Sequence, residues 1–227
     1  MTCRPNFRMA ALVALTLGGC SHPSAAPSAP SPQPSPSEQG EQSAIAQARA
    51  DSARYPYTEA DVHFMQGMIG HHAQAIVMSG WAPTHGASPS LRIMAERIIN
   101  AQQDEIATMQ TWLRDRRQDV PEAKSGPMKM KMNGVEHEML MPGMLTDAQM
   151  HELDGAKGPE FDRLFLTYMI QHHRGAVSMV QQLFDTGGAA QDEVTFKLAN
   201  DVSADQSSEI ARMQKMLTAL TPERHTQ

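Results

Sequence analysis

Cysteine is almost absent from this sequence. The 227-residue chain contains only Cys3 and Cys20, and both lie within its first 20 residues. The rest of the chain can therefore form no disulfide and offers no thiolate to a metal ion.

The sequence also lacks a long apolar run at its N-terminus. The run Met9–Leu17 is too short to span a bilayer. It follows Arg4 and Arg8 and leads into the small residues of LGGC, which end at Cys20. This pattern is typical of a bacterial lipoprotein signal, so we expect residues 1–19 to be removed and Cys20 to be lipidated. An ordinary signal peptide with an incidental cysteine is the alternative.

Basic residues are outnumbered by acidic ones. Removing the predicted signal with its two arginines leaves 17 basic and 25 acidic residues, a net charge of −8, which argues against nucleic acid as a partner. Residues 20–54 are rich in Ser, Pro, Ala, Gln and Glu and predict a disordered tether. One folded domain is expected at residues 55–220, in the cell envelope, touching the membrane only through its lipid anchor.

Methionine, by contrast, is abundant. The predicted mature chain has 16 methionines against 11 leucines, although leucine is normally among the commonest residues. Packing does not require this excess, because the flexible methionine side chain specifies a core poorly. The composition suggests a role for sulfur other than packing.

The sequence contains an internal repeat of two segments. Residues 64–79 match residues 165–180 at seven of sixteen positions, and residues 95–113 match residues 199–217 at eight of nineteen. Apolar residues recur at helical spacing in all four segments, with no strand pattern. This predicts an all-α, ferritin-like four-helix bundle made of two hairpins, at residues 58–118 and 159–220, joined by a long Met-rich connection at 119–158. A looser helical array is the alternative.

Helix boundary signals support the two hairpins. Thr58–Asp61 reads as a capping box, and Ser88-Pro89 as an N-cap followed by the first helical residue. Gly187-Gly188 and Thr221-Pro222 are expected to end the third and fourth helices. Within the connection, the capping box Thr146–Gln149 predicts a short helix at residues 147–154.

The repeat carries Met-x-x-His-His twice. On a helix, residues three and four apart share a face, so each copy offers two imidazoles and a thioether to one region. Each following segment contributes a glutamate, which needs a partner beside an apolar seam, and a methionine one turn later. The predicted bundle site comprises Met68, His71, His72, Glu105, Met109, Met169, His172, His173, Glu209 and Met213. The unrepeated His63, His85, His151 and His225 are expected to be surface or loop residues.

Thioethers favour Cu(I), whereas imidazole suits several transition metals. A di-iron site would need Glu-x-x-His on two helices, but positions 108 and 212 are Thr and Arg. The connection offers further soft ligands around a predicted type II turn at Pro142-Gly143. These candidate loop ligands are Met128, Met130, Met132, His137, Met139, Met141 and Met144. For the histidine pairs, structural pairing with glutamate in a metal-free core is the alternative.

At these motifs the chain resembles the bacterial envelope family named domain of unknown function 305. The resemblance rests on FMQGMIGHHAQAI, on MPGMLTDAQMHELDGAKGPEFDRLFLTYMIQHHRGAV, and on the Gln-x-x-Glu-Ile-x-x-Met pattern that follows each copy. It implies a ferritin-like fold and copper binding through the matching residues. Those residues are Met68, His71, His72, Met169, His172 and His173.

The sequence therefore predicts an envelope protein that sequesters or hands over copper, with Cu(I) favoured over Cu(II). We expect this protein to be a binding protein and not an enzyme. A copper-trafficking protein is an expected partner, and homodimer formation is left open. Two alternatives stand beside this reading. One is a copper or iron oxidase on the same bundle, and the other is a metal-free interaction module.

Overall fold

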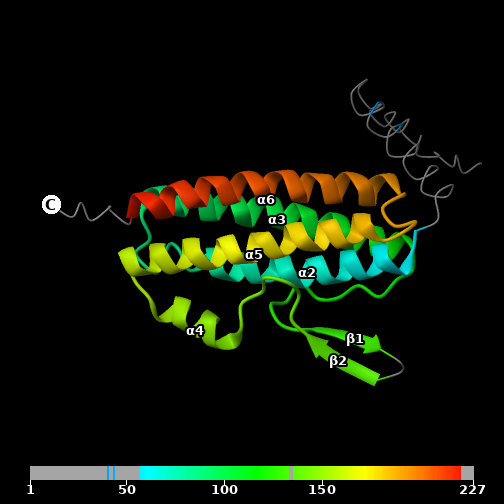
Figure 1. Cartoon of the computed structure of the whole chain (residues 1–227), viewed down its shortest axis with the longest axis horizontal. Coiled ribbons are helices and arrows are strands. Elements are labelled where there is room, and N and C mark those ends of the chain that lie inside the picture. Colours follow the sequence, from blue (N-terminus) through cyan, green and yellow to red (C-terminus); the bar gives the residue numbers. More distant parts are fainter. Residues whose placement is uncertain (1–39, 41–42, 44–56, 133–134, 221–227) are drawn as a thin grey trace, which may run out of the picture.

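The computed structural model describes residues 40, 43, 57–132 and 135–220, with residues 128–132 and 135–137 described by their backbone alone. The predicted signal, most of the predicted tether, Cys20, His225 and Thr221-Pro222 lie outside the described residues. Four long helices form a bundle, which confirms the expected all-α fold (Figure 1).

The first hairpin consists of α2 (Glu59–Gly80) and α3 (Pro89–Asp115). Both predicted N-terminal signals are confirmed. The Thr58 side chain accepts from the backbone N–H of Asp61, whose carboxylate accepts from the Thr58 backbone, and the Ser88 side chain caps α3. These caps set the start of each helix and hence the register of the histidine pair on α2 and of the glutamate on α3.

The second hairpin consists of α5 (Pro159–Asp185) and α6 (Glu193–Leu220). Helix α5 ends just before the predicted Gly187-Gly188 stop, and Gly188 has a φ of +83°, a conformation that favours glycine. The bundle thus contains the two hairpins that the repeat predicted.

The connection contains more structure than its sequence indicated. Strands β1 (Met128–Met132) and β2 (Val135–Met139) pair into an antiparallel ribbon that projects from the bundle (Figure 1). This pairing was not predicted, although Met alternates with Lys at the period of a strand, because the segment was interpreted as a Met-rich loop. The predicted short helix is confirmed as α4 (Asp147–Gly155), with its capping box.

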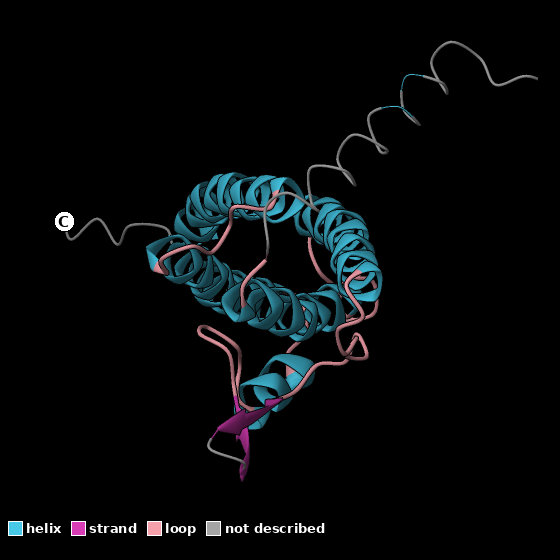
Figure 2. Ribbon diagram, turned by 90° about the vertical axis from the view of Figure 1, so that its right-hand side faces the viewer, coloured by secondary structure: helices cyan, strands magenta, loops and turns pink. Residues whose placement is uncertain are grey.

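Helices α2 and α5 pack on each other, α3 packs on α2, and α6 packs on α5. The end-on view shows the four helices together, with α4 and the ribbon on one side of the bundle (Figure 2). Apolar side chains form two clusters, one toward each end of the bundle. One includes Met68 and Met109, and the other includes Met169 and Met213. Between the clusters lies a buried polar layer that contains the repeated histidines.

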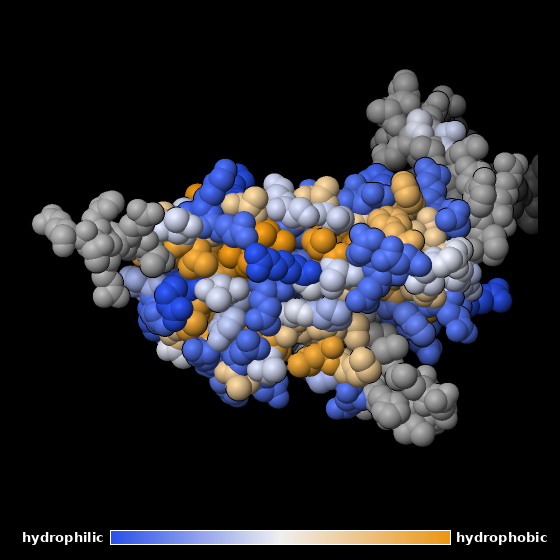
Figure 3. Space-filling view, in the orientation of Figure 1, coloured by the Kyte–Doolittle hydropathy of each residue, from blue (hydrophilic) through white to orange (hydrophobic). Residues whose placement is uncertain are grey.

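The surface is mainly hydrophilic, with apolar atoms visible between α5 and α6 and near the base of the ribbon (Figure 3). Among the described residues, no helix combines the length and apolar character needed to cross a membrane. The prediction for His85 needs correction, since it lies in a turn but is buried. Its Nε2 contacts Asp154, and its ring stacks on Trp81.

Candidate metal centre

Four histidines meet at the middle of the bundle. His71 and His72 of α2, and His172 and His173 of α5, are all fully buried. The ring centroids of His71 and His172 are 3.8 Å apart across the α2–α5 interface. Within each pair the centroids are 6.4 Å apart on α2 and 6.1 Å apart on α5. The two copies of Met-x-x-His-His therefore form one row of imidazoles.

Each outer histidine contacts a glutamate from the neighbouring helix of its own hairpin. The distance from His72 Nε2 to Glu105 Oε2 is 2.6 Å, and that from His173 Nε2 to Glu209 Oε2 is 2.7 Å. Glu105 is 16% exposed and Glu209 is 25% exposed, so both carboxylates lie at the solvent edge of the buried histidine layer. The expected glutamate–histidine contact is thus present in both hairpins.

The inner histidines bond to backbone carbonyls. His71 Nε2 lies 2.9 Å from the Pro142 carbonyl oxygen, and His172 Nε2 lies 3.0 Å from the His71 carbonyl oxygen. A carbonyl oxygen can only accept, so Nε2 carries the hydrogen in each ring. In a neutral ring of this tautomer, Nδ1 holds a free lone pair.

Both inner rings are neutral at ordinary pH. Burial, aided by the electrostatic effect of the neighbouring His72, lowers the pKa of His71 from 6.5 to about 3. Burial and repulsion from His71 also hold the pKa of His172 well below its ordinary value. Neutral imidazole is the form that binds a metal ion.

The second nitrogen of each ring has no hydrogen-bond partner. Within the described residues, Nδ1 of all four histidines is buried and unpaired. Such atoms are uncommon, because a buried polar atom without a partner loses its hydrogen bonds to water and gains none within the protein. An imidazole held at one nitrogen by a carboxylate or carbonyl, with the other nitrogen free, is the arrangement usual for a metal-ligating histidine.

The predicted methionine ligands flank this layer. Met68, Met109, Met169 and Met213 are fully buried in the two apolar clusters. Their positions suit both packing and ligation, so their role as ligands stays a prediction. Within the described residues, no three His, Cys, Asp or Glu side chains converge closely enough to hold an ion together. The layer supplies paired donors rather than a closed coordination shell.

The predicted turn at Pro142-Gly143 connects the ribbon side of the molecule to the histidine row. The backbone N–H of Met144 donates to the Met141 carbonyl, and Gly143 has a φ of +77°, both as a type II turn requires. Met144 is buried and Met141 half-buried. Because the Pro142 carbonyl accepts from His71, the turn forms part of the histidine environment. The five other candidate loop ligands lie in the ribbon.

Three glutamines near the histidine row were not among the predicted site residues. Gln74 bonds both the N–H and the carbonyl of Leu145, which fixes the turn on α2. Gln102 and Gln206 are buried beside the glutamates. Both belong to the Gln-x-x-Glu pattern that the repeat shares, so their duplication was the available signal.

The model of one protein family matches most of the chain. The family is described as Domain of unknown function (DUF305), and the match covers residues 61–217. A curated relative, uncharacterized protein L153 of Acanthamoeba polyphaga mimivirus, is 39% identical over 57 residues. That match covers 25% of this chain and 38% of the viral protein, so it spans well under half of the relative's length.

Solved structures resemble nearly the whole bundle. A DUF305 protein from Streptomyces coelicolor is 30% identical with a TM-score of 0.61, and the match covers 71% of this chain and 94% of that one. A DUF305 fragment from Deinococcus radiodurans is 27% identical with a TM-score of 0.60, covering 72% and 99%. CopM in its Cu(II)-bound form is 28% identical with a TM-score of 0.54, covering 70% and 96%. CopM has also been crystallised in Cu(I)-bound and Ag-bound forms.

Proposed function

This chain belongs to the DUF305 family, and from that premise we propose that it binds copper in the cell envelope, for sequestration or handover. One observation carries the proposal. Four buried imidazoles each have Nε2 engaged by an acceptor and Nδ1 free. A set of imidazole nitrogen donors flanked by methionines suits copper better than a hard cation.

The choice of copper draws on donor chemistry and on the family. Among the similar proteins, CopM binds Cu(I), Cu(II) and Ag in its crystal structures. Silver and Cu(I) are both soft ions, which thioethers favour. The buried methionines beside the histidine row would favour Cu(I) in this chain as well, with Glu105 and Glu209 orienting the outer rings.

The ribbon provides a second set of candidate soft ligands, of which Met139 is exposed. Its register pairs Met128 with Met139 and Met130 with His137, and pairs Lys129 and Lys131 with Glu138 and Glu136. Because cross-strand partners share a face, the soft and the charged positions alternate on opposite faces. We propose that the ribbon captures or releases the ion, and that the turn at Pro142 links it to the histidine row.

The proposed activity is binding and exchange, not turnover. The candidate donors lie in an enclosed layer, where they would hold an ion without exposing it. The signal pattern at Cys20 supports a lipid anchor in the envelope, and the Streptomyces coelicolor relative is likewise assigned to the secreted proteins. Handover would require a copper-trafficking partner protein.

The test is an anaerobic Cu(I) titration against a colorimetric competitor, with the chain from Ser21 to Gln227. Glutamine has an N–H that can replace the histidine Nε2–H, but it has no counterpart of the metal-binding Nδ1. The fourfold His→Gln variant at positions 71, 72, 172 and 173 should therefore lose Cu(I) affinity on the order of a hundredfold. His72→Gln with His173→Gln serves if the fourfold variant does not fold. The control is His63→Gln with His151→Gln, both exposed.

A ribbon variant separates the two ligand sets. Met→Leu at positions 128, 130, 132 and 139 should slow the uptake of Cu(I). Because these substitutions leave the bundle intact, the Cu(I) affinity of the histidine row should stay within about threefold of the parent value. If affinity instead persists in the His→Gln variant and disappears in the ribbon variant, the histidine row is not the copper site. Failure of the parent protein to compete for Cu(I) would overturn the copper proposal altogether.

A further inference from the structure

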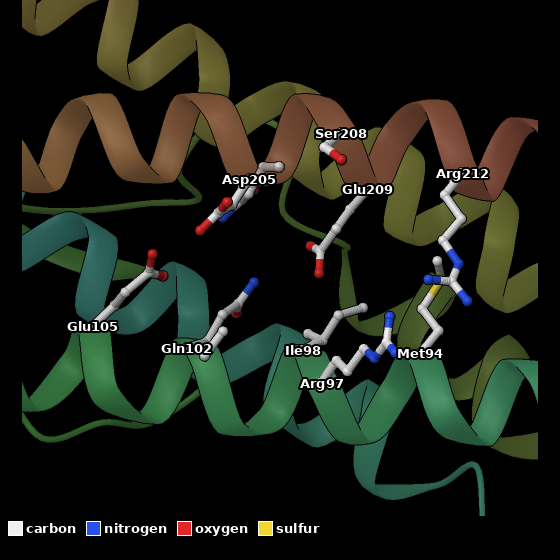
Figure 4. Close-up of a pocket in the computed structure, with 11 residues that line it drawn as sticks. Met94, Arg97, Ile98, Gln102, Glu105, Asp205, Ser208, Glu209 and Arg212 are labelled. Carbon is white, nitrogen blue, oxygen red and sulfur yellow. The ribbon is translucent and has the colours of Figure 1, made fainter.

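A polar cleft separates α3 from α6, on the outer side of the histidine row. It encloses about 260 Å³, and residues from both helices line it. Glu105 and Gln102 of α3 face Asp205 and Glu209 of α6, whereas Arg97 and Arg212 lie toward the other end (Figure 4). The cleft is therefore acidic at one end and basic at the other.

Two buried amides line this cleft without partners. Gln102 and Gln206 are each 2% exposed, and neither polar atom of either amide has a hydrogen-bond partner among the described residues. Gln102 extends from α3 toward α6 (Figure 4). Burying an unsatisfied amide costs about 1–3 kcal/mol, so two related positions that both do so indicate a missing ligand.

Carboxylates surround the amides. Glu105 and Glu209 each use Oε2 for a histidine, which leaves Oε1 for another partner. The pKa of Asp205 is raised, because partial burial and the neighbouring Glu105 and Glu209 disfavour its charged form. Like charges gathered in this way are stabilised by a cation between them.

We propose that the acidic end of this cleft binds a divalent cation that prefers oxygen ligands, of the Ca²⁺ or Mn²⁺ type. The oxygen donors would be the Gln102 and Gln206 amides together with no more than two of the carboxylates that line the cleft, those of Asp205, Glu105 and Glu209. Hard cations select carboxylate and amide oxygens, whereas Cu(I) selects the sulfur and imidazole of the buried layer. Because no three carboxylate or imidazole side chains of the described bundle converge on one point, water completes the coordination shell.

This cation site is distinct from the proposed copper site, although the two are adjacent. Each glutamate connects them, because its Oε2 contacts a histidine and its side chain lines the cleft. The cation site uses neither Nδ1 nor sulfur, so its existence does not depend on copper binding. The two proposals can therefore fail separately.

The test is a Mn²⁺ titration of the chain from Ser21 to Gln227, in which free Mn²⁺ is counted by electron paramagnetic resonance. Gln102→Leu with Gln206→Leu removes both amides and should weaken Mn²⁺ binding about tenfold or more. Asp205 is exposed, so Asp205→Asn should keep the fold. Because this substitution removes a negative charge, it should weaken Mn²⁺ binding by about the same factor. Ca²⁺ added to the loaded protein measures which cation is preferred.

The control is Glu96→Gln, which removes an exposed carboxylate from α3 outside the cleft. It should change Mn²⁺ affinity by less than about twofold. All these variants should keep Cu(I) affinity, which separates this site from the copper site. The proposal is overturned if the parent binds no Mn²⁺ saturably, if Cu(I) displaces Mn²⁺ stoichiometrically, or if the double leucine variant melts higher and binds Mn²⁺ as before.

Discussion

The two helical hairpins hold their outer histidines in the same way and their inner histidines differently. His72 and His173 each contact the glutamate of their own hairpin. His172 bonds to the backbone of the opposite hairpin, at His71, whereas His71 bonds to the connection, at Pro142. The repeat thus preserves contacts within a hairpin, but the inner contacts are not equivalent.

The reason is that one connection serves two hairpins. It crosses the α2–α5 face, where Gln74 and Gly175 occupy matching positions of the repeat. Gln74 reaches out and bonds Leu145, whereas Gly175 leaves room for the chain at Pro142. A single asymmetric segment cannot make equivalent contacts with both copies, so two matching positions have acquired opposite roles.

Acid should destabilise the protein strongly through both inner histidines. Both folded-state pKa values are depressed, that of His71 to about 3, so below pH 6.5 the unfolded chain binds protons that the folded chain does not. Their contribution is complete above pH 6.5 and decreases as the pH falls. Between pH 7 and pH 5 we expect the free energy of unfolding to fall by about 2 kcal/mol from His71, with a further decrease from His172.

Urea denaturation at several pH values measures this effect for the two hairpins separately. His71→Gln and His172→Gln should each reduce the slope by about one proton, or about 1.4 kcal/mol per pH unit, despite their different partners. His63→Gln is exposed and should leave the slope unchanged. Equal slopes in the parent and in both variants would show that the inner rings become charged in the folded protein.

Much of this architecture was predictable because it depends on local and repeated signals. The capping residues Thr58, Ser88 and Thr146 begin the helices where the sequence indicated. The Glu105 and Glu209 contacts followed from one shared pattern at helical spacing. Such features need no knowledge of how distant segments meet.

The remaining features depend on tertiary contacts that no periodicity encodes. Nothing in the sequence indicates that the Pro142 carbonyl reaches His71, a residue 71 positions earlier. His85 looked like a surface residue because its partners, Asp154 and Phe161, belong to another part of the chain. The ribbon was missed because the alternation of Met with Lys in Met128–Met132 spans only five residues and does not show which segment it pairs with.

Replacing Gly175 should break the asymmetric contact. A Cβ there would lie 1.9 Å from the Pro142 carbonyl oxygen, so the turn must move and the His71 bond is lost. We expect Gly175→Ala to cost about 2–3 kcal/mol in the free energy of unfolding. Gly70→Ala is the matched control, since a Cβ at this position meets only the Lys124 carbonyl oxygen, at 3.7 Å. This substitution should stabilise the helix by up to about 1 kcal/mol. Stabilisation by both substitutions would mean that the turn is not held against α5.

Neutralising the glutamates tests the contact that the two hairpins share. In Glu105→Gln and Glu209→Gln the amide oxygen still accepts from the histidine Nε2–H, so only the charge assistance is lost. Each substitution should cost about 1 kcal/mol, and the two costs should agree within about 0.5 kcal/mol. Glu209 is the more exposed, so its cost should be the smaller of the two. A large cost in one hairpin with none in the other, measured by urea denaturation, would show that the asymmetry imposed by the connection extends to the outer histidines.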